Sequence, residues 1–195
     1  AYNILSVGRS DGNSSRGPTL LDEPGRIKPE IVAPRDRTSW ATPINSAAAA
    51  LLLETADADS NLDYLGRTGK ALLVKALLMA GATKDEFPDW RKGFETPCTD
   101  GTVPLDYRYG AGELNIDHSH LILTSGEQNA GGASDVGLIG WDSGSASSST
   151  NRQYFFEVPA YSYIERLSVL VTWFRQLTVS GKPSQVKQFT PDSAN

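Results

Sequence analysis

The sequence predicts an α/β fold over its first 125 residues, followed by the start of a β-sandwich. Up to residue 125, short apolar runs bounded by glycine or proline alternate with longer Ala/Leu-rich segments, which is typical of strands alternating with helices. A polar, glycine-rich stretch follows at 126–136 and predicts a linker. From 137 to 195, aromatic and β-branched runs separated by serine-rich turns predict a partial, jelly-roll-like β-sandwich.

In the α/β part, two short apolar runs predict buried strands, at 3–7 and 28–34. Three longer segments predict helices, at Pro43–Thr55, 68–80 and 116–125. The first of these helices is expected to begin at Pro43, because a proline in the first helical turn lacks an N–H that would have no partner there. It is also expected to be buried, because 47–53 contain no polar residue.

In the second part, three β-like runs are expected to form strands, at 136–141, 154–158 and 167–173. The stretch 176–195 is polar and predicts no further strand. Four aromatic residues alternate with polar ones: Trp141, Phe155, Phe156 and Trp173. They fit either an aromatic binding face or the core of a small sandwich, and we favour the core.

Composition limits the partners that we expect. The net charge of −5 argues against a nucleic acid or an anionic membrane surface. No apolar run approaches the roughly 20 residues that a membrane-spanning helix needs. The single cysteine, Cys98, cannot form a disulfide within the chain.

The run Arg37-Thr-Ser-Trp-Ala-Thr-Pro43 places a hydroxyl group directly before an apolar helix. A free serine hydroxyl is a weak nucleophile and needs a base, a group that orients the base, and donors for the developing oxyanion. A helix N-terminus supplies such donors through its unpaired N–H groups and the positive end of its dipole. Ser39 is therefore a candidate nucleophile. The alternative is an ordinary N-cap, since serine and threonine are favoured there without any catalytic role.

This run resembles the Gly-Thr-Ser-x-Ala-Ser/Thr-Pro signature of subtilisin-like serine peptidases. Three other segments resemble motifs of the same family in the same order. Asn3-Ile-Leu-Ser-Val-Gly8 is similar to a Val-Ile-x-Val-Gly strand, and Lys28-Pro-Glu-Ile-Val-Ala-Pro34 to Lys-Pro-Asp/Glu-Ile-x-Ala-Pro. Tyr109-Gly-Ala-Gly-Glu-Leu-Asn115 is similar to a Gly-x-Gly-x-Val/Leu-Asn turn. The resemblance implies the C-terminal part of a three-layer subtilisin-like domain with a parallel sheet.

The resemblance also implies a function. Ser39 would be the nucleophile of a serine endopeptidase and its backbone N–H an oxyanion donor, with Thr38 completing the motif. The catalytic Asp and His and the oxyanion Asn of this family precede these motifs, so we expect them upstream of Ala1 and expect this chain alone to be inactive. His118 and His120 follow Ser39, and we expect them to be exposed or capping.

Two departures from the family weaken the assignment. Arg37 stands where the family has glycine, and a side chain there would crowd the approach of a substrate backbone. Only 35–38 separate Pro34 from Ser39, where the family has a longer segment. The alternative function is therefore a non-catalytic subtilisin-like scaffold with a C-terminal binding module.

The resemblance further implies a polypeptide substrate and a secreted or cell-envelope location. The other expected partners are the upstream portion of the same protein and a second copy paired through an exposed sheet edge. No cofactor is required, with calcium as an optional structural ion. Four oxygen-bearing residues at alternate positions are weak metal candidates: Asp57, Asp59, Asn61 and Asp63. Three aromatic residues of a long loop fit either a cleft lining or inward packing: Phe87, Trp90 and Phe94.

Overall fold

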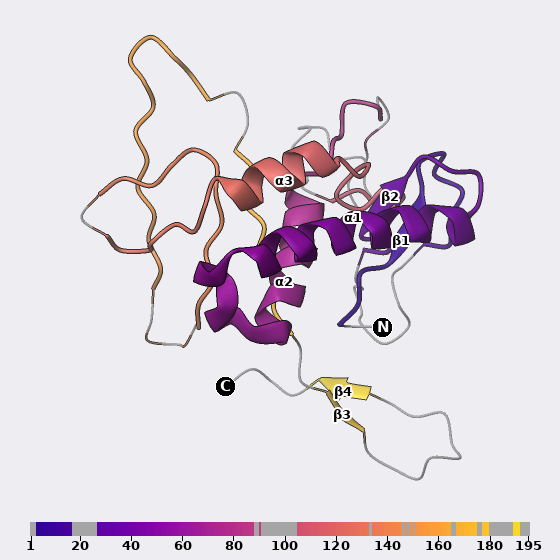
Figure 1. The fold of residues 1–195 in the computed structure, drawn as a ribbon. Helices are drawn as coiled ribbons and strands as arrows, with labels where there is room; N and C mark the ends of the chain where they lie inside the picture. The colour runs from indigo at the N-terminus through magenta and orange to yellow at the C-terminus, as the bar shows by residue number, and fades with distance from the viewer. Residues whose placement is uncertain are drawn as a thin grey trace.

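The computed structural model describes residues 3–16, 27–87, 90, 105–132, 134–145, 147, 149, 151–164, 167–174, 177–179 and 189–191. Over these residues it is a mixed α/β structure (Figure 1). The helices are α1 (Thr38–Ala58), α2 (Gly66–Ala80) and α3 (Ile116–Thr124), with the 3-10 helix η1 (Ser60–Leu65) between the first two. The strands are β1 (Val7–Arg9), β2 (Ile31–Ala33), β3 (Leu177–Val179) and β4 (Phe189–Pro191).

β1 and β2 form a short parallel sheet in which Val7 pairs with Ile31. The chain at 111–114 lies along the other side of β2: the Val32 N–H donates to Gly112 at 3.0 Å, and the Leu114 N–H donates to Val32 at 2.9 Å. Glu113 in turn pairs with Thr83, extending the hydrogen-bonded layer by one more segment. β2 is thus bracketed on both edges, and all three of its residues are buried.

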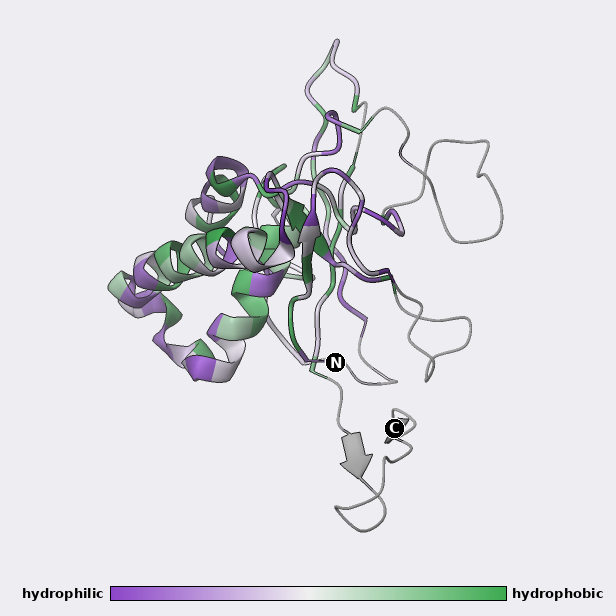
Figure 2. Cartoon of the chain, turned by 90° about the vertical axis from the view of Figure 1, so that its right-hand side faces the viewer, coloured by the Kyte–Doolittle hydropathy of each residue, from purple (hydrophilic) through white to green (hydrophobic). Residues whose placement is uncertain are grey.

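The three helices pack against one another, and α1 also packs against both strands, which lie beside its N-terminal half (Figure 1). The buried residues of α1 recur every three or four positions, which gives one inward-facing stripe: Ala41, Asn45, Ala48, Leu52 and Ala56. Three of them, Ala48, Leu52 and Ala56, meet Leu73, Leu77 and Leu78 of α2 in the main core. Figure 2 shows where the apolar residues lie: hydrophobic residues, in green, gather where the helices meet the strands.

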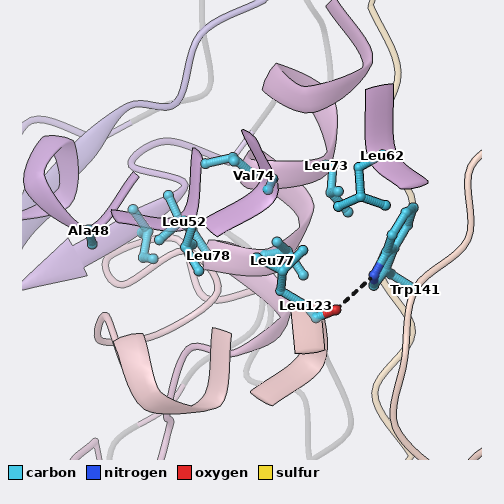
Figure 3. Packing of buried hydrophobic residues seen from close by; sticks show 11 residues of the cluster. Ala48, Leu52, Leu62, Leu73, Val74, Leu77, Leu78, Leu123 and Trp141 are labelled. Carbon is cyan, nitrogen blue, oxygen red and sulfur yellow. Dashed lines mark hydrogen bonds between the residues drawn. The ribbon is translucent and has the colours of Figure 1, made fainter. Parts of the chain in front are cut away.

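Trp141 ties the segment after 126–136 to this core. Its side chain is 8 % exposed and packs among the leucines of η1, α2 and α3 (Figure 3). Its Nε1–H donates to the Leu123 carbonyl at the end of α3, at 3.1 Å. Around it, Gln128 and Gly126 exchange backbone hydrogen bonds with the Trp141 backbone. The predicted linker is therefore paired with residues on its far side.

The structure differs from several sequence predictions. The first strand occupies 7–9 rather than 3–7, because the register with β2 begins at Val7. α1 begins five residues before Pro43. By contrast, the helices expected at 68–80 and 116–125 lie within two residues of the predicted bounds.

The predicted strands at 154–158 and 167–173 have no regular strand pairing in the structure. Phe155 is 57 % exposed and Trp173 is 67 % exposed, so they do not form a sandwich core with the buried Trp141. The prediction of one shared aromatic core was wrong, because no described element covers these side chains. Where no strand was predicted, β3 and β4 pair antiparallel, with Thr178 opposite Thr190.

No helix within the described ranges has both the length and the apolar character needed to cross a membrane.

Candidate functional site at the N-terminus of α1

The candidate site lies where β2 passes into α1. β2 ends at Ala33, and a tight turn follows in which the Arg35 N–H donates to the Ala33 carbonyl at 2.9 Å. Arg37 is the N-cap residue in an extended conformation (φ −137°, ψ 139°), and its side chain makes no capping hydrogen bond. The four residues 34–37 thus suffice to connect the buried strand to the helix.

Ser39 is the second residue of α1 and is exposed. The serine hydroxyl does not cap the helix, and no hydrogen bond to it is formed by any part of the chain that the structure describes. The N-cap interpretation of this residue was therefore wrong: the helix begins at Thr38, one residue before Ser39, its N-cap is Arg37, and the Ser39 side chain is left unused.

The first turn of α1 has the free donors that helix geometry predicts. The N–H groups of Trp40 and Ala41 both donate to the Arg37 carbonyl, each at 3.0 Å. Those of Thr38 and Ser39 donate to no acceptor in the described ranges, as expected for the first positions of a helix. No acidic side chain lies in this turn to neutralise the positive end of the helix dipole.

Pro43 is inside α1 and modifies the same turn. Proline has no N–H, so the Ser39 carbonyl lacks the donor that the fourth following residue of a helix normally supplies. Ala41 is fully buried and fixes the inner side of this turn. Thr42 donates its hydroxyl to the Thr38 carbonyl at 2.8 Å. An exposed serine thus sits on a turn whose inner side is fixed by packing.

Arg37, which replaces the glycine of the subtilisin-like motif, does not cover Ser39. Its guanidinium carbon lies 5.1 Å from the centre of the Trp40 ring, in a cation–π contact. Trp40 is 52 % exposed, so this pair lies on the surface beside the serine.

Behind the site, a buried carboxylate fixes the start of β2. Glu30 accepts hydrogen bonds from the Ser6 N–H and from Lys75 and forms an ion pair with Lys28, each at 2.8 Å. Burial alone would raise the pKa of this carboxyl, but the two ammonium groups and the amide hold its pKa below the ordinary value. Sequence reasoning missed this role. The available signal was a charge pair two positions apart on one strand face, Lys28 and Glu30.

The glycine-rich turn predicted at 109–115 packs against the same strand. Gly110 has φ +61°, and a Cβ there would lie 2.3 Å from the Glu30 carbonyl group. Only glycine fits both the conformation and the space. Asn115 ends the turn as the N-cap of α3, accepting from the His118 N–H at 3.0 Å. The motif segments 28–34 and 109–115 are thus adjacent in the structure.

The remaining predicted residues lie elsewhere. His118 and His120 are on exposed positions of α3. Phe87 packs inward against Tyr109 with ring centres 3.9 Å apart, and Trp90 lies beside them, which favours packing over a cleft. Phe94 falls outside the described residues.

The weak metal candidates serve other contacts. Asp57 and Asp63 both pair with Lys70, at 2.6 and 3.6 Å. Asp59 caps η1 by accepting from the N–H and the side-chain amide of Asn61, each at 2.9 Å. No cluster of three metal-binding side chains occurs within the ranges that the structure describes.

Two shallow polar hollows lie near the segment after α3, with volumes of about 240 and 310 Å³. Glu127 and Asn129 line both of them, and Ser39 lines neither.

Comparison with known proteins gives no match: no family model, no curated protein and no solved structure is significantly similar to this chain.

Proposed function

We propose that this chain is the nucleophile-bearing part of a subtilisin-like serine endopeptidase. One observation carries the proposal: Ser39 is exposed in the first turn of α1, and its hydroxyl is not used by the helix. The four ordered motif resemblances supply the reaction class. On this proposal β1, β2 and 111–114 belong to the parallel sheet of that domain.

In the proposed reaction, the Ser39 Oγ attacks the carbonyl carbon of a peptide bond. Its proton passes to a histidine base supplied by sequence upstream of this chain, which is held by an aspartate from the same region. The free N–H of Ser39 points its positive end at the new oxyanion, and the α1 dipole adds to this stabilisation. The C–N bond then breaks, the amine leaves with the proton, and water hydrolyses the acyl-enzyme.

A fluorophosphonate probe tests the proposal, because it reacts with a serine only when base and oxyanion donors are assembled. We expect the full-length protein to be labelled at Ser39 and to lose all labelling on Ser39→Ala. Ser46→Ala is the matched control, since Ser46 is exposed on the same helix. Folded protein that is not labelled, or labelling that persists in Ser39→Ala, would reject the proposal.

A second candidate is a non-catalytic scaffold whose C-terminal region binds protein or carbohydrate. The observation that favours it is the exposure of Phe155 and Trp173, whose rings are available to a ligand. An upstream sequence without the Asp and His motifs would support this candidate and exclude catalysis.

A further inference from the structure

We propose that Arg37 makes the Ser39 site selective for peptides with an acidic side chain close to the scissile bond. This inference rests on the proposed function and deepens it by naming a substrate class. It concerns the position at which the sequence departs from the glycine of the subtilisin-like motif.

The first step is that the Arg37 charge has no carboxylate partner among the described residues. Arg35 and Arg37 are both exposed, and neither forms an ion pair with any carboxylate among the described residues. Asp36 lies between them in sequence, is also exposed, and pairs with neither. Arg35 instead donates from Nη1 to the carbonyl of its neighbour Pro34, at 3.1 Å. The protein carries a net charge of −5. Two exposed guanidinium groups close to Ser39 in sequence, without a carboxylate partner in the described ranges, therefore form a local positive charge on an acidic protein.

The second step is that the Arg37 side chain is held in place. Its contact with the Trp40 ring limits the rotation of a long side chain, and the ring lies on the same helical turn as Ser39. A ring contact of this kind leaves the guanidinium N–H edge free, and that edge matches the two oxygens of a carboxylate. The entropy lost when a ligand fixes the side chain is correspondingly smaller.

The third step is distance. The backbones of Arg37 and Ser39 are at most about 7 Å apart, and the Arg37 guanidinium lies against the ring of Trp40, the residue that follows Ser39. An acidic side chain within three positions of the scissile bond can therefore reach Arg37 while its peptide carbonyl faces Ser39. The unneutralised N-terminus of α1 adds to the local positive potential.

The test measures binding, so that it does not depend on turnover. Full-length Ser39→Ala protein is titrated with fluorescein-labelled heptapeptides that differ only by Glu, Gln or Lys at one position. We expect the best Glu peptide to bind about two- to fivefold more tightly than its Gln counterpart, as for an exposed charge pair. The ratio should fall towards one in high salt.

The variants locate the effect. Arg37→Gln should abolish the preference for Glu, and Arg37→Glu should reverse it in favour of Lys. Arg67→Gln, at an exposed arginine of α2, is the matched control and should retain the preference. Equal binding of all three peptides, or a preference that survives Arg37→Gln, would overturn the inference. Failure of the proposed function has a different signature, which is wild-type protein that selects acidic peptides and yet is not labelled by the fluorophosphonate.

Discussion

Glu30→Gln is the substitution that most directly tests how β2 is held behind the candidate site. The change keeps the size of the side chain and removes its charge, which leaves the ammonium groups of Lys28 and Lys75 without their carboxylate. Removing one partner of a buried ion pair lowers the free energy of unfolding by about 3–5 kcal/mol. The two lysine side chains are 12 % and 20 % exposed and therefore reach some water. We accordingly expect a loss of about 2–3 kcal/mol in the free energy of unfolding.

Urea unfolding followed by circular dichroism measures this loss. With a slope of about 2 kcal/mol per molar urea, the midpoint should fall by about 1 M. Glu54→Gln is the matched control, because Glu54 is exposed on α1 and has no ion-pair partner among the described residues. A Glu30→Gln midpoint equal to that of Glu54→Gln would refute the reasoning.

The pH dependence provides a second readout for the same carboxylate. The pKa of Glu30 is lowered in the folded protein, so the folded state holds this proton less tightly than the unfolded state does. Its contribution is therefore fully present above the ordinary glutamate pKa of 4.5 and is lost as the pH falls through the lower folded-state value. Glu30→Gln should remove this component of acid destabilisation, and an unchanged acid profile would contradict the assignment.

Three further substitutions test the packing by the same unfolding assay. Gly110→Ala should cost more than about 2 kcal/mol, since a Cβ at φ +61° would also meet the Glu30 carbonyl at 2.3 Å, and a cost below 1 kcal/mol would disprove the clash. Trp141→Phe should cost about 1–3 kcal/mol because it removes the indole hydrogen bond to the Leu123 carbonyl, which keeps only the Gly126 N–H among the described residues, and leaves space beside the buried ring, whereas Trp173→Phe, at an exposed ring, should change nothing. Asn45→Leu should stabilise by about 1 kcal/mol, because the buried Asn45 Oδ1 accepts no hydrogen bond in the described structure, and destabilisation would point to an undetected donor.

Local sequence signals predicted the helices well and the strands only in part. α2 and α3 carry their own start and stop signals, such as the Asn115 cap and Gly81, so their bounds follow from the residues themselves. The first strand does not, because which residues of 3–9 pair is decided by β2, more than twenty residues away. Apolar character marks a strand but leaves its register open.

The start of α1 shows a different limit. A proline before an apolar run favours the first helical turn, which placed the start at Pro43. The helix instead begins at Thr38, since the missing proline N–H costs only the bond to the Ser39 carbonyl, while burial of Ala41 favours extending the helix toward β2. Tertiary packing decides between these starts, and it is the earlier start that places Ser39 in a helical turn.

The aromatic residues after residue 136 show that an alternating sequence pattern does not determine which side chains become buried. Alternation predicts an apolar face along 167–173, and its side chains are exposed, while Thr172 donates to the Leu72 carbonyl of α2 at 3.2 Å. Alternation does not say what covers that apolar face. Trp141 is buried because α3 ends beside it, whereas Trp173 has no described neighbour of that kind. Trp141 and Trp173 therefore lie in opposite environments, one buried and one exposed, although their local sequence patterns are similar.

The candidate site depends both on residues close together in sequence and on contacts between distant segments of the chain. The residue types around Ser39 are local, and they suffice to suggest acyl transfer. Their orientation is not local, because it depends on β2 being held by β1, by 111–114 and by the Glu30 ion pairs. For Glu30 the sequence offers only the nearby Lys28 as a signal, since its other partners, Lys75 and Ser6, lie 45 and 24 residues from it. A short motif can therefore suggest a chemistry, while the direction in which the serine faces is set by residues that the motif does not contain.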